Sequence, residues 1–124
     1  MKTNVKGTNI VLTEAITNYL DEKLGHVDKL LPQAPDAYLA EIELAKETMH
    51  HRQGEVFKAE INLSVGGNNF YAVASEEDLY AAIDAMKDEV IRQIKTKFEK
   101  KNTMLRRGGR KAKDLLRSLY RWRK

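Results

Sequence analysis

The sequence predicts an α+β domain with the element order β-α-β-β-β-α, in which a four-stranded sheet carries two helices on one face. Two segments have apolar residues at three- and four-residue spacing, which predicts amphipathic helices. Residues 56–65, "VFKAEINLSV", alternate apolar and polar side chains, which is typical of a strand with one buried and one wet face. A chain of 124 residues is long enough for one such domain with a single core.

The N-terminal part predicts a short strand followed by a helix. Residues 3–6 read as the strand, and Gly7 closes it. Thr13 is the expected N-cap of the helix, and Glu14 follows in the first turn, where a carboxylate suits the positive helix end. "LPQAP" ends the helix because proline disfavours its continuation. The buried stripe of this helix is expected to contain Ile16, Leu20, Leu24, Val27 and Leu31.

Three further strands are predicted over residues 38–44, 56–65 and 70–74. "GGNN", from Gly66 to Asn69, predicts a hairpin turn because Gly and Asn tolerate positive φ. Residues 46–55, "KETMHHRQGE", are expected to form a loop. The face of the sheet away from the helices is expected to be solvated and to carry Glu41, Glu43, Lys58, Glu60 and Asn62.

The second helix is predicted to begin at Ser75, which forms a capping-box pattern with Asp78. Its buried stripe is expected to contain Leu79, Ile83, Met86, Val90, Ile94 and Phe98. We expect the domain to occupy residues 1–101 and residues 102–124 to be a basic, flexible tail that "RRGG" separates from the helix.

The sign of the charge changes along the chain. Residues 1–86 contain 7 Lys and Arg against 14 Asp and Glu, whereas residues 87–124 contain 15 Lys and Arg against 4 Asp and Glu. The helix dipole favours acids at the start of a helix and bases at its end, but by only about 0.3–1 kcal/mol per charge and within one turn. The excess of basic residues therefore indicates a polyanionic partner.

Several function classes lack their sequence signatures. The chain has no cysteine, and the adjacent His50 and His51 form a poor metal pair because neighbouring strand residues point to opposite faces. The sequence contains no phosphate-binding glycine loop and no nucleophile elbow. We therefore expect no enzyme, no cofactor and no small-molecule substrate. The N-terminus shows no secretory signal and no membrane span, so a cytoplasmic protein is expected.

Basic helices without an enzyme signature favour nucleic-acid binding, because Lys and Arg neutralise phosphates and release counterions. The element order is similar to that of the double-stranded RNA-binding module, which reads the shape of A-form RNA. A generic double-stranded RNA-binding protein therefore stays an alternative. A membrane-surface binder is a third possibility, since the tail is a basic amphipathic segment.

Two segments resemble the ribosome hibernation-promoting factor family, also called ribosome-associated inhibitor or protein Y. "NIVLTEAITNYLDEKLGHVDKLL" is similar to its first helix, and "FKAEINLSVGGNNFYAVASEEDLYAAIDAMKDEVIRQI" to its most distinctive block. The resemblance covers residues 1 to about 101. It implies a protein that binds the small ribosomal subunit at the channel for messenger and transfer RNA. Such a protein inhibits translation and protects idle ribosomes under stress or in stationary phase.

The resemblance also implies a set of RNA-binding residues, because family members place basic side chains of both helices against ribosomal RNA. The matching positions are Lys23, Lys29, Arg92 and Lys95. Charge alone adds Lys87, Lys97, Lys100, Lys101, Arg106 and Arg107. His26 and Glu89 depart from the family pattern and remove positive charge from the expected RNA-binding face. The residues after 101 are too few for the dimer-forming domain of long members, so we expect a short form that is monomeric when free.

Overall fold

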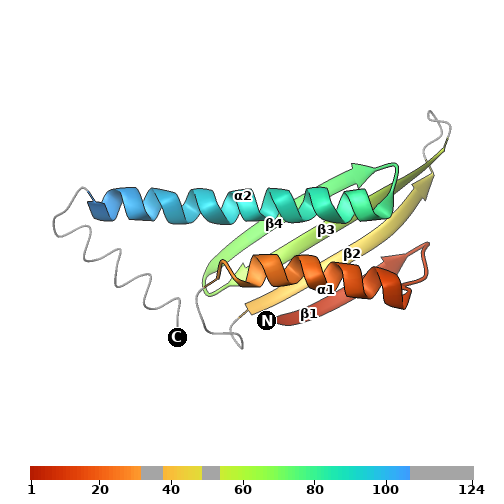
Figure 1. Cartoon of the computed structure of the whole chain (residues 1–124), viewed down its shortest axis with the longest axis horizontal. Helices are drawn as coiled ribbons and strands as arrows, with labels where there is room; N and C mark the ends of the chain where they lie inside the picture. Colours follow the sequence, from red (N-terminus) through yellow and green to blue (C-terminus); the bar gives the residue numbers. More distant parts are fainter. Residues whose placement is uncertain (32–37, 49–53, 107–124) are drawn as a thin grey trace.

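The computed structural model describes residues 1–31, 38–48 and 54–106, and within this part it describes only the backbone of residues 48 and 98–106 (Figure 1). The element order β-α-β-β-β-α is confirmed. The elements are β1 (Lys2–Thr8), α1 (Glu14–Asp28), β2 (Tyr38–Thr48), β3 (Glu55–Val65), β4 (Asn68–Glu76) and α2 (Leu79–Arg106).

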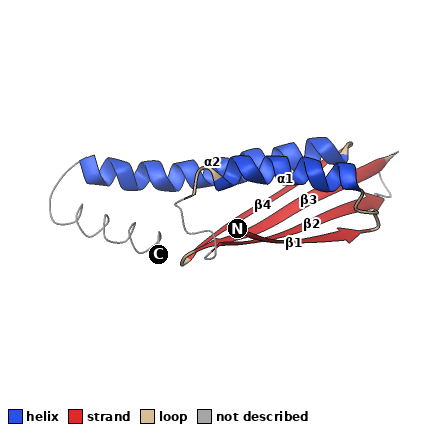
Figure 2. Cartoon of the chain, turned by 60° about the horizontal axis from the view of Figure 1, so that its bottom comes forward, coloured by secondary structure: helices blue, strands red, loops and turns tan. Residues whose placement is uncertain are grey.

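The four strands form one mixed sheet in the order β1-β2-β3-β4. β1 runs parallel to β2, and the other neighbouring pairs are antiparallel. Both helices lie on the same face of this sheet, as the sequence predicts (Figure 2). β2 and β3 pair as far as Thr48 and Glu55, so the predicted loop over residues 46–55 is wrong at both of its ends. The polar side chains there are compatible with strand because one face of the sheet is wet.

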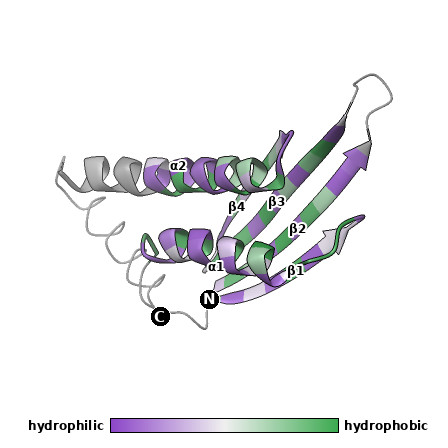
Figure 3. Ribbon diagram, turned by 45° about the vertical axis from the view of Figure 1, so that its right-hand side comes forward, coloured by the Kyte–Doolittle hydropathy of each residue, from purple (hydrophilic) through white to green (hydrophobic). Residues whose placement is uncertain are grey.

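The core lies between the sheet and the helices. Hydrophobic and hydrophilic residues alternate along much of β2 and β3 (Figure 3). Most of the hydrophobic ones belong to the core that the helices cover, and Ala45 and Val56 are buried outside it. Within β3 the expected faces are confirmed: Ala59, Ile61, Leu63 and Val65 are buried, and Phe57 is half-buried. No polar or charged residue among those described is buried. The helices contribute Leu20, Leu24, Val27, Leu79, Ala82, Ile83, Met86, Val90 and Ile94.

The start of α1 is predicted correctly and the start of α2 is not. Thr13 caps α1, and its hydroxyl accepts a hydrogen bond from the backbone N–H of Ile16 at 3.3 Å. Asp78, not Ser75, caps α2, since its Oδ2 accepts from the N–H of Ala81 at 3.3 Å. Ser75 is still part of β4, which pairs with β3 as far as Glu76. Pairing in the sheet thus delays the helix beyond the expected capping box.

The hairpin between β3 and β4 is tighter than expected. Val65 pairs with Asn68, so only Gly66 and Gly67 form the turn, and both asparagines of "GGNN" belong to β4. Gly66 has φ 61°, a conformation that side chains disfavour. The short turn fixes the register of β4 against β3.

Helix α2 crosses the boundary that the sequence suggests at residue 101 and ends at Arg106. The division into a domain and a tail stays a prediction, because residues 107–124 lie outside the described part. None of the described helices combines the length and the apolar character that crossing a bilayer requires. The described residues also contain no cluster of three potential metal ligands, and His50 and His51 lie outside them.

Candidate nucleic-acid interface

The two helices lie side by side and run in the same direction, so both C-terminal ends point to one end of the molecule (Figure 1). This basic end carries Lys29, the C-cap of α1, and Arg92 and Lys95 on α2. The negative end of the α1 dipole suits Lys29 there, whereas Arg92 and Lys95 stand several turns before the end of α2 at Arg106, beyond the reach of its dipole. The fold thereby gathers at one end basic residues that are far apart in the sequence.

The expected site residues differ in the exposure of their side chains and in whether a carboxylate is already paired with them. Lys29 and Lys95 are exposed and form no ion pair with any other described residue. The side chain of Lys23 is only 18% exposed, and its Nζ lies 3.7 Å from Asp84 Oδ1. That of Lys87 is 16% exposed, and its Nζ lies 3.0 Å from Asp88 Oδ1.

Lys97 lies on the flank of α2 that faces β4. Its ammonium donates a hydrogen bond to the side-chain carbonyl of Asn68 and lies 5.7 Å from the ring centroid of Phe70. Lys100, Lys101 and Arg106 belong to the last turns of α2, where only the backbone is described, and Arg107 lies outside the described residues. RNA contacts by Lys100, Lys101, Arg106 and Arg107 therefore stay predictions.

A cluster between the helices surrounds Lys23. The Tyr19 hydroxyl donates to the Asp84 carboxylate, with oxygen distances of 2.7 and 2.8 Å. Tyr80 packs its ring edge against Tyr19 at a centroid distance of 4.9 Å, and Lys23 Nζ also lies 4.9 Å from the Tyr19 ring centroid. The hydrogen bond to Asp84, followed by desolvation, raises the pKa of Tyr19 to about 12. Asp84 was not among the expected site residues.

Arg92 forms a two-pronged ion pair with Glu89. The distances are 2.9 Å from Nε to Oε2 and 2.6 Å from Nη2 to Oε1. The hydrogen bond from Arg92 and then that from Gln93 lower the pKa of Glu89 to about 2. Arg92 nevertheless has a side chain that is 64% exposed. Glu89, which departs from the family pattern by removing positive charge, therefore lies directly beside an expected RNA-binding residue.

Gln93 connects this ion pair to the edge of the sheet. Its Nε2 donates to the Tyr71 carbonyl at 2.7 Å, and its Oε1 accepts from the Tyr71 N–H at 3.3 Å. The same Nε2 lies 3.0 Å from Glu89 Oε1. Because β4 is an edge strand, the side chain of Gln93 takes the place of a neighbouring strand at Tyr71.

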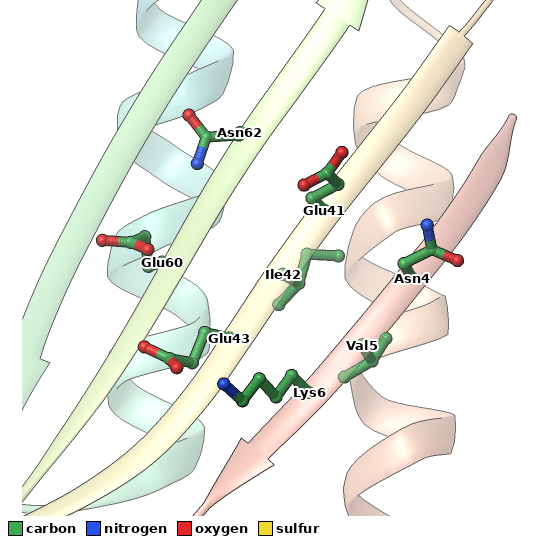
Figure 4. Close-up of a pocket in the computed structure, with 8 residues that line it drawn as sticks. All are labelled: Asn4, Val5, Lys6, Glu41, Ile42, Glu43, Glu60 and Asn62. Carbon is green, nitrogen blue, oxygen red and sulfur yellow. The ribbon is translucent and has the colours of Figure 1, made fainter.

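The face of the sheet away from the helices carries carboxylates and cations side by side. A shallow pocket of about 260 Å³ lies there and presents the carboxylates of Glu41, Glu43 and Glu60 together with the ammonium of Lys6 (Figure 4). Lys58 Nζ lies 3.5 Å from Glu43, and the Thr8 hydroxyl, which donates to Glu43, is the main cause of the lowered pKa of that carboxyl. Three carboxylates against one ammonium in this pocket repel phosphates, so this face is the less suitable one for RNA.

Comparison with known proteins identifies the family. Residues 3–102 match the model of the family described as Sigma 54 modulation protein / S30EA ribosomal protein. The chain belongs to this family. It is 30% identical over 105 residues to a ribosome hibernation promoting factor of Pseudomonas putida, covering 85% of this chain and 94% of that relative. The resemblance stated from the sequence is confirmed.

Other relatives include a protein about twice as long and two solved structures with the same fold. A ribosome hibernation promotion factor of Picosynechococcus sp. is 32% identical over 105 residues, but the chain spans only 51% of its length. The N-terminal domain of Thermus thermophilus protein Y has a TM-score of 0.63 and 27% identity, with coverage of 77% of this chain and 98% of that one. A ribosomal subunit interface protein from Coxiella burnetii, with 16% identity and a TM-score of 0.63, shares the fold.

Proposed function

We propose that this protein is a ribosome hibernation factor that acts by binding and not by catalysis. It binds the small ribosomal subunit through ribosomal RNA at the channel for messenger and transfer RNA. In that position it inhibits translation and protects idle ribosomes under stress or in stationary phase. The proposed compartment is the cytoplasm, where the ribosomes are.

One observation carries this proposal: the chain matches 94% of the length of a relative named ribosome hibernation promoting factor. The match therefore covers almost the whole of that relative and not a shared fragment. The basic end supports the proposal, because Lys29, Arg92 and Lys95 lie there on two parallel helices, whereas the pocket on the far face of the sheet presents more carboxylates than cations.

Within the site, we propose that the exposed cations make the first contacts with phosphates. These are Lys29 and Lys95, together with Arg92, which keeps a largely exposed guanidinium. Lys23 and Lys87 would contact RNA after leaving their carboxylate partners. The remaining proposed contacts come from Lys97, Lys100, Lys101, Arg106 and Arg107.

The test is co-sedimentation with purified small ribosomal subunits over a range of salt concentrations. Arg92→Glu combined with Lys95→Glu should weaken binding at each salt concentration. Each lost phosphate contact should also reduce the slope of log K against log salt by about one unit. The matched control is Lys2→Glu combined with Lys6→Glu, which changes the net charge equally on exposed positions of β1.

The control should bind as the unchanged protein does. If both double variants lose affinity equally, general charge attraction explains binding and the basic end is not the site. Binding to free duplex RNA as tight as to the subunits would indicate the generic double-stranded RNA-binding protein instead. Unchanged binding of the Arg92 and Lys95 variant would remove these residues from the interface.

A further inference from the structure

An open, mainly apolar groove lies at the end of the molecule opposite the basic end, where both helices begin. Its volume is about 640 Å³, and its apolar lining consists of Ile10, Val11, Ile16, Phe57, Leu79 and Tyr80. Val11 is 79% exposed and Tyr80 is 37% exposed. Apolar side chains exposed side by side in a groove are typical of a surface that binds another protein segment.

The surroundings of this groove carry negative charge. Asp78 is part of the lining, and Glu76 and Glu77 precede it as exposed residues. Lys46 also lines the groove, but its Nζ lies 2.6 Å from the Glu55 carboxylate, which compensates its charge. The groove therefore suits a segment that combines large apolar side chains with Lys and Arg.

The C-terminal residues of this same chain have that composition. Residues 107–124 contain eight Lys and Arg against one acid, Asp114. Between them stand the apolar residues Leu115, Leu116, Leu119, Tyr120 and Trp122. We propose that the groove binds residues 115–122 of a second copy of this chain.

The length of the chain favours the C-terminal segment of a second copy over the protein's own. Helix α2 is straight in Figures 1 and 2, and its 28 residues separate the groove from Arg106. At 1.5 Å per residue this distance is about 42 Å. The nine residues 107–115 span at most about 32 Å when fully extended. Leu115 of the same chain therefore stops short of the groove, and Leu119 would reach it only with the segment almost fully stretched.

Two consequences follow. Two copies that exchange these segments make two equivalent contacts, so the assembly closes as a symmetric dimer. A free dimer at high concentration then replaces the monomer expected from the sequence. A segment held in the groove is also withheld from phosphates, so docking and RNA binding by residues 107–124 exclude each other.

Trp122 offers a direct measurement because it is the chain's single tryptophan. Its fluorescence and the sedimentation equilibrium of the full-length protein are recorded from low to high micromolar concentration, without ribosomes. The emission maximum should move to shorter wavelengths as dimer forms, since Trp122 leaves water for the apolar groove. High salt should reverse part of the shift by screening the acidic surroundings.

Val11→Asp should keep the protein monomeric and the emission at long wavelength at every concentration. The matched control is Val73→Asp, at a 45% exposed position on the far face of the sheet, which should dimerise as the unchanged protein does. A monomer at every concentration would overturn the proposal. So would dimerisation of Val11→Asp, or a blue-shifted emission that does not depend on concentration, which would show that the segment docks on its own chain. Because no ribosome is present, these outcomes leave the proposed function untouched.

Discussion

Replacement of Gln93 by Ala should loosen the edge of the sheet at one identifiable peptide. The side chain makes two hydrogen bonds to the backbone of Tyr71, at 2.7 and 3.3 Å. A hydrogen bond contributes about 0.5–1.5 kcal/mol net, and water can replace these two at an exposed edge, so the lower end applies. The better helix propensity of Ala offsets a few tenths of a kcal/mol of this destabilisation. We expect Gln93→Ala to destabilise the protein by about 1 kcal/mol.

Amide hydrogen exchange measures this locally, and urea denaturation measures it globally. A loss of about 1 kcal/mol corresponds to roughly fivefold faster exchange of the Tyr71 N–H, provided that β4 exchanges by local opening. Thr96→Ala, at an exposed position of the same helix, is the control and should leave this amide unchanged. If the Tyr71 amide exchanges equally fast with and without the Gln93 side chain, the two hydrogen bonds do not protect the edge.

Two further predictions concern the core and the cluster between the helices. Ile61→Ala should destabilise the protein by about 2–5 kcal/mol, because Ile61 is fully buried at the centre of the sheet. The control Asn62→Ala, on the wet face, should destabilise it by less than about 0.5 kcal/mol. Equal shifts in chemical denaturation would mean that the faces of β3 are assigned wrongly. Asp84→Asn should lower the pKa of Tyr19 from about 12 toward 10.0, which ultraviolet titration of the tyrosines can follow with Tyr19→Phe as the reference. Since the raised pKa favours the folded state below pH 10, that stabilisation should disappear as pH rises from 10 to 12 in the unchanged protein, and a variant with the same alkaline stability profile would contradict the assignment.

Much of the fold could be predicted because each element repeats its own period over many residues. The stripe from Leu79 to Ile94 and the alternation from Ala59 to Val65 both describe the buried side correctly. The boundaries could not be predicted in the same way. Ser75 and Asp78 are both good N-caps, and only the pairing of Phe57 with Glu76 shows that the earlier one is still in the sheet.

The candidate site could be predicted only as a distribution of charge. The sequence separates acidic from basic halves, and parallel helices convert this into a basic end, but it does not show which cations are already paired. Lys23 and Asp84 stand 61 positions apart, and nothing local connects them. Glu89 stands three positions before Arg92, so helix geometry could have indicated that pair.

Two of the paired cations, Lys23 and Arg92, remain compatible with the proposed contacts to RNA, because neither of their carboxylate partners is left without a hydrogen-bond donor when the cation moves away. Asp84 keeps the Tyr19 hydroxyl when Lys23 leaves, and Glu89 keeps the Gln93 amide when Arg92 leaves. Exposed ion pairs contribute only about 0–1 kcal/mol, so exchanging Glu89 for a phosphate costs the 64% exposed Arg92 little. Lys23, whose side chain is only 18% exposed, loses more when it leaves Asp84. Removing the cation from a buried pair would be far more expensive. The acidic residues beside the basic end therefore hold its cations in place in the free protein without preventing their release.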